Sequence, residues 1–314
     1  MTKKTLIKQK TQEKIMVSVI LVCYNAAEFL QVSIKSILQQ NFAFIELIII
    51  DDGSTDETQN TIKAFQDPRL KFFQLKNNCG IAQARNYGLM LATGKYIAIM
   101  DADDQAHPNR LGAQVKYLEN NPEIGIVGTQ VIKVIGKKKI LMKYRDNDAI
   151  IKSRLLAMNG SALIHPSTMF RRSIIEKLFI NYPGTKTDVD HHMWFLAAKR
   201  GVNFGVVEKP LLLYRRHGKN ITSEFSDDAE AHEARKNELR TEMFCFYFPN
   251  IAQSLASKFV ELLNPKYNPA MLNITDDEYL CIISAINDSK SVIGESREEL
   301  KTIVTAALNR KIFS

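Results

Sequence analysis

Short apolar runs alternate with amphipathic stretches over the first hundred residues of the chain. Residues 44–50 are almost continuously apolar, as expected for a strand that is buried on both faces of a sheet. The predicted strands are 17–23, 44–50, 70–75 and 96–100. The predicted helices are a stretch that opens at Asn25 and Ala26, residues 56–66, and residues 81–92 with Gly94 as the glycine that ends the helix. Strand and helix at this spacing predict right-handed βαβ units and a parallel sheet.

The pattern changes in the second half of the chain. Residues 124–145 predict a β-hairpin that turns at Gly136 and the three lysines after it. Such a lysine-rich turn is usually solvated, although it could also meet an anionic acceptor or lipid. A further helix is predicted over residues 190–200, ended by Gly201.

Helices alone are predicted beyond the α/β part. Thr275 with Glu278, and Ser296 with Glu299, match the capping box that opens a helix. An aromatic group in this region is compatible with core packing, with a dimer face or with docking on a membrane; it comprises Phe244, Phe246, Tyr247 and Phe248. The sequence therefore predicts a basic N-terminal tail (1–15), an α/β domain (16–225) and a helical C-terminal region (226–314).

The composition is that of an ordinary globular protein. With 314 residues, 45% hydrophobic and 24% charged, it excludes disorder, collagen-like repeats and a disulfide scaffold. The cysteines are widely spaced and form no CxxC pair, which favours a reducing compartment and no structural zinc; they are Cys23, Cys79, Cys245 and Cys281. No apolar run approaches the roughly 18 residues that span a bilayer. Because no apolar signal core follows the basic N-terminus, we expect a cytoplasmic protein.

The net charge of +8 favours anionic partners, which include nucleic acid, acidic lipid and phosphorylated small molecules. We expect no nucleic acid among them, because the sequence has no RNP-type aromatic pattern, zinc finger or basic heptad helix. Peripheral contact with anionic lipid is favoured by the basic residues near the N-terminus, Lys3, Lys4, Lys8, Lys10 and Lys14.

Polar residues follow three of the predicted strands, at 23–25, 51–53 and 101–103. Ligands of open α/β sheets bind beyond the carboxyl ends of the strands, so this edge is the candidate site. No GxGxxG follows the first strand, which argues against a dinucleotide site. Residues 88–95 lack the spacing of a P-loop and end a helix rather than begin one, so we exclude that motif as well.

Asp101, Asp103 and Asp104 bring three carboxylates into four positions. Their repulsion would raise a pKa unless a hard cation such as Mg²⁺ or Mn²⁺ relieves it. Asp101 and Asp103 point the same way in extended geometry, so one can bind the metal while the other accepts from a sugar hydroxyl. The alternative is a solvated acidic turn that caps the helix near Pro108.

The run after the second strand also permits two roles. Ser54 or Thr55 could N-cap the next helix, with Asp56 and Glu57 favourable to its dipole. Asp52 could accept from the imide N–H of uracil, while the helix terminus favours a phosphate or polar ligand. These roles are compatible with each other.

Four motifs in order carry a family resemblance: VILVCYN (19–25), DDGSTD (51–56), ARN (84–86) and DADD (101–104). Together they resemble glycosyltransferase family 2, the inverting nucleotide-diphosphosugar transferases of the GT-A fold. The resemblance extends over residues 16–222, about two-thirds of the chain. It implies an α/β fold with a Rossmann-like, mostly parallel sheet flanked by helices, and a C-terminal helical extension. Cys23 departs from the more usual Pro or Thr, and residues 78–80 depart from the family's consecutive glycines.

The resemblance implies a site for a nucleotide-diphosphosugar donor, with a UDP-sugar expected. The residues that would line the nucleoside pocket are Tyr24, Asn25, Asp52 and Arg85. Asp101 would approach the ribose, and Asp103 would hold a Mn²⁺ or Mg²⁺ ion that bridges the diphosphate.

Three further segments would complete the site. Residues 213–222 resemble the family's closing motif, from which Arg216, His217 and Lys219 would contact the diphosphate or the metal, with His217 as a metal ligand. The alternative is a basic surface loop. Asp104 and His165 would lie on the diphosphate and acceptor side, and His165 could instead be a structural loop histidine.

Inverting transfer needs a base to take the proton of the acceptor hydroxyl. Family 2 usually supplies it from a Glu-Asp pair ahead of a helix that contains a Trp. Counting back from Trp194 puts Asp190 at the aspartate and Val189 where the glutamate would be, with Asp188 in reserve. Either aspartate could instead N-cap the helix 190–200.

These observations favour a metal-dependent inverting glycosyltransferase that builds a surface polysaccharide or lipooligosaccharide on a glycan or lipid-linked acceptor. We expect it in the cytoplasm or peripherally on the inner face of the membrane, with a homodimer through the C-terminal helices as a further option. A sugar-nucleotide pyrophosphorylase is one alternative, although residues 23–27 lack its glycine-rich, Arg-bearing loop. A nucleotide-sugar or glycan binding module without catalysis is the other.

Overall fold

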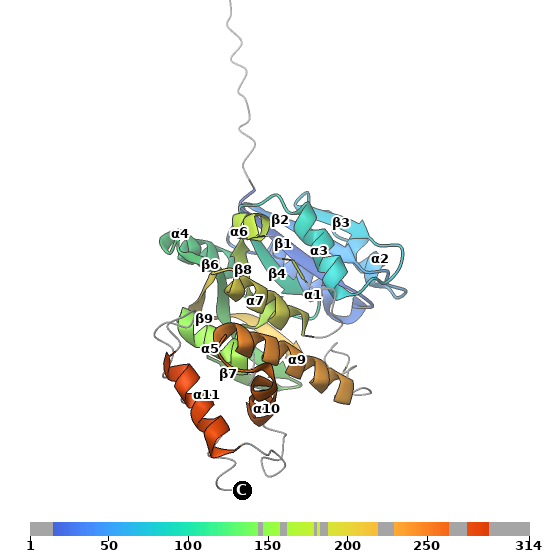
Figure 1. Cartoon of the computed structure of the whole chain (residues 1–314). Helices are drawn as coiled ribbons and strands as arrows, with labels where there is room; N and C mark the ends of the chain where they lie inside the picture. The colour runs from blue at the N-terminus through green and yellow to red at the C-terminus, as the bar shows by residue number, and fades with distance from the viewer. Residues whose placement is uncertain are drawn as a thin grey trace, which may run out of the picture.

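A computed structural model describes residues 15–143, 147–157, 162–178, 181–182, 188–218, 229–263 and 275–288. The strands are β1 (Val17–Cys23), β2 (Ile45–Asp51), β3 (Leu70–Gln74), β4 (Tyr96–Asp101), β5 (Gln105–Ala106), β6 (Ile124–Ile135), β7 (Lys138–Met142), β8 (Met169–Arg171) and β9 (Asn203–Arg216). In the part described, they form one nine-stranded sheet in the order β3-β2-β1-β4-β8-β6-β9-β5, with β7 paired to β6 (Figure 1).

The first half of the sheet is parallel, as the sequence predicts. β1 pairs in parallel with both β2 and β4, and β3 continues the parallel order beyond β2. β8 then runs antiparallel between β4 and β6, and β6 pairs in parallel with β9. The carboxyl ends of β1, β2 and β4 therefore lie along one edge of the sheet.

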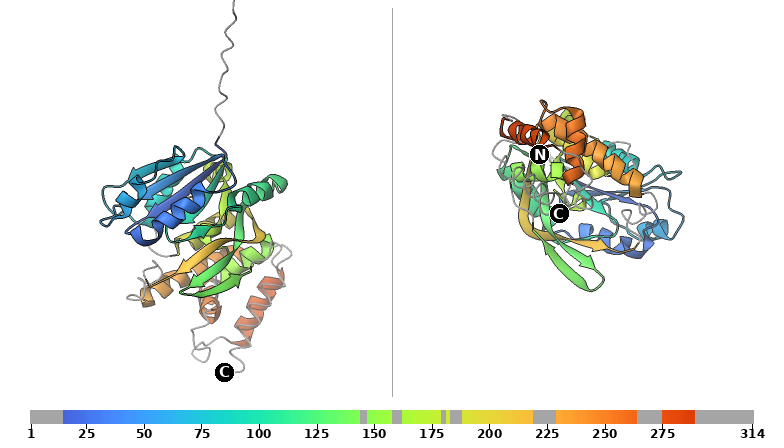
Figure 2. Two further views of the ribbon diagram at one scale, coloured as in Figure 1. Left: turned by 180° about the vertical axis from the view of Figure 1, so that it is seen from behind. Right: turned by 60° about the horizontal axis from the view of Figure 1, so that its bottom comes forward.

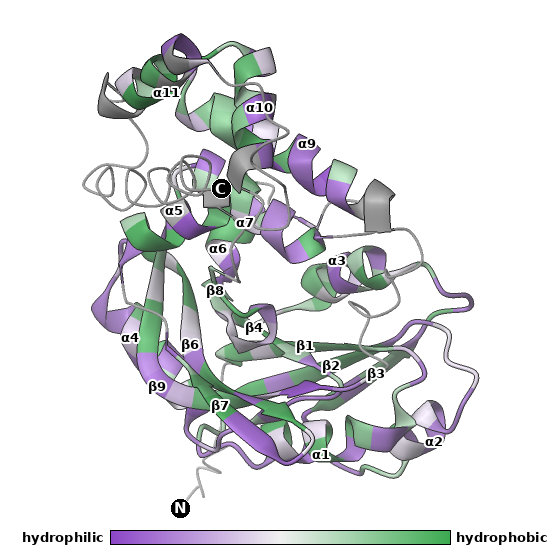
Figure 3. Cartoon of the chain, turned by 90° about the horizontal axis from the view of Figure 1, so that it is seen from below, coloured by the Kyte–Doolittle hydropathy of each residue, from purple (hydrophilic) through white to green (hydrophobic). Residues whose placement is uncertain are grey.

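Helices flank the sheet. They are α1 (Ala27–Leu38), α2 (Thr58–Lys63), α3 (Ile81–Leu91), α4 (Arg110–Asn120), α5 (Asp148–Ala157), the 3₁₀ turn η1 (His165–Ser167), α6 (Arg172–Leu178), α7 (Val189–Lys199), α9 (Ala229–Tyr247), α10 (Gln253–Leu263) and α11 (Asp276–Asp288). Figure 3 shows α1 and α2 on one face of β1–β3 and α3 on the other. This is the α/β architecture with a helical C-terminal part that the sequence predicts.

Burial on both faces explains why β2 reads as a continuous apolar run. Every residue of β2 is buried, and Ile48, Ile49 and Ile50 have no exposed surface. Each fully buried side chain of this size stabilises the fold by roughly 1.5–3 kcal/mol. The central strands therefore fix the sheet edge on which the polar residues lie.

Gly94 does not end its helix in the way the sequence predicts. The cap of α3 is Ala92, in extended conformation, and Gly94 is not among the glycines with positive φ. A Cβ at Gly94 would lie 2.6 Å from the backbone nitrogen of Ser18, so the glycine is needed where the chain passes close to β1. Gly201 does follow α7 with a φ of +76°, which confirms that prediction.

Through the aromatic group, α9 packs on α7 and α10 packs on α9. The ring of Phe244 lies 4.7 Å from the rings of Phe248 and Phe259, and Phe246 lies 5.9 Å from Phe195 of α7. Core packing is thus the role of these aromatic residues. The left view of Figure 2 shows α9–α11 at the opposite end of the molecule from β1–β3. No helix in the described part has the length and apolar character to cross a membrane.

The predicted capping box opens α11. The backbone N–H of Glu278 donates to Thr275 Oγ1 at 3.2 Å, and the Thr275 N–H donates to Glu278 Oε2 at 3.0 Å. The second predicted box, at Ser296 and Glu299, lies outside the described residues.

The buried carboxylate of Glu46 connects β2 to β1, to β3 and to the loop before β4. Glu46 of β2 accepts from the hydroxyl and backbone N–H of Thr93, from the hydroxyl of Ser18, and from the ammonium of Lys71 at 2.6 Å. Burial alone would raise the pKa of Glu46, but the hydrogen bonds outweigh it and lower that pKa below its usual range. The ionised form is therefore the one that the fold stabilises.

We expect Glu46→Gln to lower the free energy of unfolding by about 2–3 kcal/mol at pH 7, because the variant leaves buried donors poorly matched. Since folding lowers the pKa of Glu46, its contribution is complete above the unfolded value of about 4.3 and is lost as the pH falls. The gap between wild type and variant in urea unfolding should therefore narrow below pH 4. Glu119→Gln, which removes an exposed partner of Lys95, is the matched control and should cost less than about 1 kcal/mol.

Candidate active site

The loops after β1 and β2 are tied together by side-chain hydrogen bonds to the backbone. Ser54 Oγ accepts from the N–H of Asn25 at 2.9 Å, and Asn25 Oδ1 accepts from the N–H of Thr55 at 2.9 Å. Thr58 Oγ1 accepts from the N–H of Ala26 at 2.8 Å. Asn25 has a φ of +47°, in the left-handed region that Asn tolerates. The two loops therefore form one rigid unit beside Tyr24, whose side chain is 48% exposed.

Neither Ser54 nor Thr55 caps the helix after β2, contrary to one of the sequence interpretations. That helix, α2, begins at Thr58, and the Thr58 N–H donates to Asp56 Oδ1 at 3.0 Å. The Ser54 hydroxyl is directed to the loop after β1 instead. The N-cap residue is Glu57, which makes no side-chain capping bond, and Asp56 before it accepts from the first N–H of the helix.

Asp52 is buried, and both of its carboxylate oxygens are engaged. Oδ1 accepts from the N–H of Cys79 at 2.8 Å, and Oδ2 accepts from the N–H of Gly80 at 3.0 Å. Burial, and then the hydrogen bond to Asp52, raise the pKa of Cys79 to about 11. Asp52 thus fixes the turn before α3. The hydrogen bond from the imide N–H of uracil to Asp52 stays a prediction. It would use a lone pair that the two backbone N–H groups leave available on a carboxylate oxygen.

Arg85 of α3 links three segments of the site. Its Nη2 donates to Asp101 Oδ1 at 3.0 Å, and its guanidinium lies over the ring of Tyr182, 5.4 Å from the centroid. Tyr182 is held by two backbone hydrogen bonds with the side chain of Asn86, both 2.8 Å. The motif Ala84-Arg85-Asn86 therefore orients an acidic residue on one side and an aromatic ring on the other.

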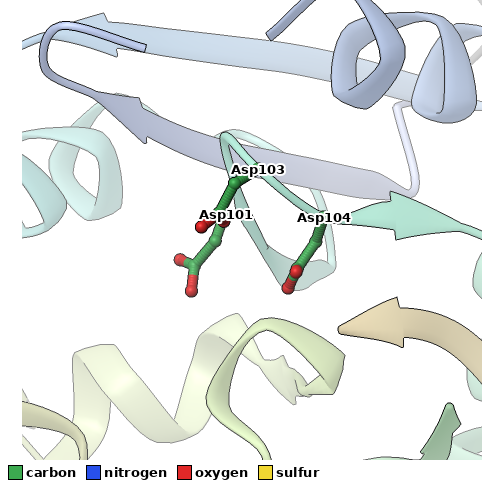
Figure 4. A group of neighbouring side chains, drawn as sticks. All are labelled: Asp101, Asp103 and Asp104. Atoms are coloured by element: carbon green, nitrogen blue, oxygen red, sulfur yellow. The ribbon is translucent and has the colours of Figure 1, made fainter. Parts of the chain in front are cut away.

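The acidic loop after β4 brings its three carboxylates together. The side chains of Asp101, Asp103 and Asp104 each have an oxygen within 4.8 Å of the others. Figure 4 shows Asp101 and Asp103 directed to the same side of the loop, with Asp104 beside them. Asp104 Oδ1 accepts from the N–H of Arg215 at 2.8 Å. Burial, and then the charges of Asp101 and Asp103, raise the pKa of Asp104 well above its usual range.

The end of β9 closes over this loop. His217 Nε2 lies 3.0 Å from Asp103 Oδ2, and Arg215 Nε donates to the carbonyl oxygen of Asp103 at 2.9 Å. The His217 ring and the Arg215 guanidinium both contact the ring of Phe29 on α1, each at 4.8 Å. The structure thus brings His217 to Asp103, two residues that are predicted to share a metal. Arg216 is the last residue of β9, and Lys219 lies outside the described residues.

The sequence analysis missed Arg110, which lies behind the acidic loop. Its side chain is fully buried and donates to the carbonyl oxygens of Ile99 at 2.8 Å and Thr168 at 3.3 Å. Burial lowers the pKa of Arg110 to about 10, against the effect of Asp104 and Asp101. Its charge therefore faces the carboxylates from inside the protein. The available signal was an arginine on the apolar face of the helix after DADD.

Asp190 lies in the first turn of α7, and its side chain is 34% exposed. Burial raises the pKa of Asp101; Arg85 opposes this rise, and the charges of Asp103 and Asp190 add to it. Asp190 is therefore close enough to the acidic loop to act on it. Asp188 occupies the N-cap position with a φ of +53° and makes no side-chain capping bond.

His165 is buried behind Arg85 and Tyr182. Its Nε2 lies 2.8 Å from the hydroxyl of Tyr182, and its ring lies 5.5 Å from the ring of Trp194. Burial, followed by the charges of Arg85 and Arg110, lowers the pKa of His165 well below its usual range. The imidazole is thus neutral at physiological pH, and it supports Tyr182 from below.

Comparison with known proteins decides the family. The family model described as "Glycosyl transferase family 2" matches residues 18–179, about half of the chain. The chain belongs to glycosyl transferase family 2. It is a glycosyltransferase, which excludes the sugar-nucleotide pyrophosphorylase.

Curated relatives agree with this assignment. The glycosyltransferase is 33% identical over 251 residues to an uncharacterized glycosyltransferase of Haemophilus influenzae, with 75% of each chain covered. It is 29% identical over 184 residues to the UDP-Glc:alpha-D-GlcNAc-diphosphoundecaprenol beta-1,3-glucosyltransferase WfgD of Escherichia coli, which covers 59% of this chain and 70% of that one.

Solved structures share the fold. TarS of S. aureus (residues 1–349), in complex with UDP-GlcNAc, superposes with a TM-score of 0.64 at 19% identity, over 95% of this chain and 88% of that one. The mannosyltransferase PcManGT of Pyrobaculum calidifontis, in complex with GDP-Man and Mn²⁺, gives a TM-score of 0.56 at 17% identity, over 94% and 86% of the two chains. At this identity the likeness shows the fold alone.

The residues of the glycosyltransferase fit a divalent cation at the acidic loop. Three carboxylates and one imidazole supply oxygen and nitrogen donors of the kind that Mg²⁺ and Mn²⁺ accept. Asp104 Oδ2 is buried and has no hydrogen-bond partner among the described residues, as expected for an atom that a cation would satisfy.

We expect Mn²⁺ alone to raise the melting temperature of the glycosyltransferase. At a hundred times Kd, binding adds about 2.7 kcal/mol to stability, roughly 5 °C or more in Tm. Asp103→Asn should abolish most of this rise while leaving the metal-free Tm unchanged or higher, because it removes one of three repelling charges. Asp277→Asn, an exposed aspartate of α11, makes the same change of charge and should respond like wild type in differential scanning fluorimetry.

Proposed function

We propose that this glycosyltransferase transfers a sugar, with inversion, from a nucleotide-diphosphosugar to a hydroxyl of a glycan or lipid-linked acceptor. A UDP-sugar is the proposed donor. The observation that carries the proposal is the meeting of Arg85, Asp101, Asp103 and Asp190 from three separate segments at one edge of the sheet. This edge is where open α/β sheets bind their ligands.

The printed names of similar proteins support the substrate classes. TarS is in complex with UDP-GlcNAc and PcManGT with GDP-Man and Mn²⁺, so both neighbours bind nucleotide sugars. The name of WfgD gives UDP-Glc as donor and a diphosphoundecaprenol-linked sugar as acceptor. On this basis we propose a role in surface polysaccharide or lipooligosaccharide synthesis, with the protein peripheral on the inner face of the membrane. A homodimer through the C-terminal helices stays a prediction.

On the donor side, the loops after β1 and β2 would receive the nucleoside. Tyr24 and Asn25 lie on the rigid loop unit, and Asp52 and Arg85 border it. Because Arg85 already holds Oδ1 of Asp101, the other oxygen of that carboxylate is oriented for a ribose hydroxyl. The donor side is thus prearranged by hydrogen bonds within the protein, which lowers the entropic cost of binding.

A divalent cation, when bound, would supply positive charge that offsets the charge growing on the departing diphosphate. Asp103 and His217 would hold it, with Asp104 Oδ2, which has no hydrogen-bond partner in the described part of the chain, beside them. Arg216 and Lys219 would add positive charge from the segment that follows β9. Arg110 balances the carboxylates from behind.

On the acceptor side, Asp190 would act as the base. The acceptor oxygen forms a bond to the anomeric carbon while the bond from that carbon to the diphosphate oxygen breaks, and the hydroxyl proton passes to the Asp190 carboxylate. Attack opposite the leaving group inverts the anomeric centre. The partial exposure of Asp190 leaves it accessible to a hydroxyl, and its effect on the pKa of Asp101 indicates its proximity to the donor site.

Nucleotide selection provides the first test. We expect UDP, in the presence of Mn²⁺, to raise the Tm of the full chain more than GDP, CDP or TDP do, because the proposed base pocket is built for uracil. The UDP response should require the metal and should disappear in Asp103→Ala. Equal shifts with all four nucleotides would remove the uracil assignment, and no shift with any of them would contradict a nucleotide-diphosphosugar donor.

The base is tested by Asp190→Asn. We expect kcat to fall about a thousandfold, since proton removal by a placed base contributes 10²–10⁴. The UDP-induced rise in Tm should be retained, because the variant leaves the donor side intact. Donor-sugar release and transfer would be followed by chromatography of the products.

Asp188→Asn is the matched control for that variant. It makes the same change two residues away, and Asn tolerates the left-handed conformation of Asp188. It should retain kcat within about tenfold. Loss of activity in Asp188→Asn alone would transfer the role of base to Asp188, and normal activity of both variants would leave neither as the base.

A further inference from the structure

The hairpin formed by β6 and β7 has an unusual charge pattern. Residues 124–143 contain five lysines and no acidic residue: Lys133, Lys137, Lys138, Lys139 and Lys143. The part of the chain that is described gives none of these lysines an ion pair with a carboxylate. Their charges therefore add up at one end of the sheet and would attract an anionic surface.

Apolar side chains are exposed among these lysines. The exposed fractions are 44% for Ile135, 37% for Ile140 and 46% for Leu141. In the register of the hairpin, Ile135 lies opposite Lys138 and Ile140 lies opposite Lys133, so each of these two isoleucines shares a face with a lysine. Aliphatic groups bordered by lysines suit the boundary between lipid head groups and acyl chains, where lysine stems also contribute apolar surface.

The charge also argues against a second copy of the chain at this place. Among the described residues, β7 pairs with β6 alone and its other edge has no strand beside it; such an edge is the usual site of strand-to-strand association. Lysines on an edge strand oppose such pairing, and two copies of this hairpin would bring ten positive charges together. An anionic bilayer is therefore the better match for this surface than another copy.

The same surface is continuous with the candidate active site through β9. Lys133 lies beside Tyr214 and Ile135 beside Arg216 in the parallel pairing of β6 with β9. Tyr214 in turn is near the acidic loop: burial, and then the charges of Asp101 and Asp104, raise its pKa to about 12. A membrane that touches the hairpin tip would thus lie near the end of β9, which contacts the acidic loop.

We propose that the tip of the β6–β7 hairpin docks on an anionic lipid bilayer. Lysines 133, 137, 138, 139 and 143 would contact lipid phosphates, and Ile135, Ile140 and Leu141 would enter the interface. Docking there holds the active-site edge next to the membrane, where the sugar of a lipid-linked acceptor is displayed. This last consequence rests on the proposed function, whereas the docking itself rests on the hairpin alone.

Vesicle co-sedimentation of the full chain tests the proposal. Wild type should bind vesicles of phosphatidylcholine with 30% phosphatidylglycerol (a probe composition of roughly physiological anionic content) and bind pure phosphatidylcholine at least tenfold more weakly. The variant Lys137→Gln/Lys138→Gln/Lys139→Gln should lose at least tenfold in binding to the anionic vesicles, because each lysine near such a surface contributes about fivefold. A second variant, Ile140→Ser/Leu141→Ser, should also bind more weakly.

Lys35→Gln/Lys63→Gln/Lys116→Gln is the matched control, since it removes three exposed lysines from α1, α2 and α4. It has the same net charge as the hairpin variant and should bind like wild type. Equal loss in both triple variants would show that net charge alone drives binding, and undiminished binding of the hairpin variant would overturn the proposal. A wild type that ignores vesicles but forms a dimer dependent on the hairpin would overturn it in favour of a second copy.

The UDP-induced rise in Tm, measured on the same proteins, separates this proposal from the proposed function. The hairpin variants should retain the nucleotide response of wild type, because they change no residue of the donor side. Vesicle binding without any nucleotide response would leave the docking surface standing and remove the donor assignment. A nucleotide response without vesicle binding would overturn the docking surface and leave the donor assignment standing.

Discussion

Three carboxylates crowded at the end of β4 are the constraint around which the other parts of the site are arranged. Asp101, Asp103 and Asp104 cannot lie within 4.8 Å of one another without compensation. The protein supplies it from three directions: Arg85 donates from α3, Arg110 is buried behind the loop, and the backbone of Arg215 donates from β9. These groups come from α3, α4 and β9, so the site forms only when the strands of the sheet are in their native order.

The sheet edge that carries the candidate site was predictable because its determinants are local. The strand β2 is apolar apart from Glu46 and the final Asp51 since it is buried on both faces, and runs of this kind locate the strand ends at which Asp52 and Asp101 lie. Gly201 after α7 and the box of Thr275 with Glu278 are likewise readable from a few neighbouring residues. The order of the four motifs then gave the family, which the family comparison confirms.

What the sequence could not provide are contacts between distant segments. Ser54 has the side chain of a helix cap, and only its position opposite Asn25 diverts it to another loop. Gly94 has the position of a helix-ending glycine, but a glycine is needed there because the backbone of Ser18, 76 residues away, leaves no room for a side chain. Arg110 falls on the apolar face of its helix in the sequence, but its role depends on the carbonyl oxygens of Ile99 and Thr168, which distant segments supply. In each case propensity is overridden by packing.

The hydrogen bond between Asp104 and Arg215 connects residues 111 positions apart in the sequence, and the one between Asp103 and His217 connects residues 114 positions apart. Contacts of such separation form late in folding, after the local βαβ units. A chain still emerging from the ribosome therefore carries the acidic loop without the strand that completes it. The carboxylate of Asp103 and the imidazole of His217, which we propose to share a cation, meet only once β9 has joined the sheet, so the proposed site would exist in the folded molecule and not in the nascent chain.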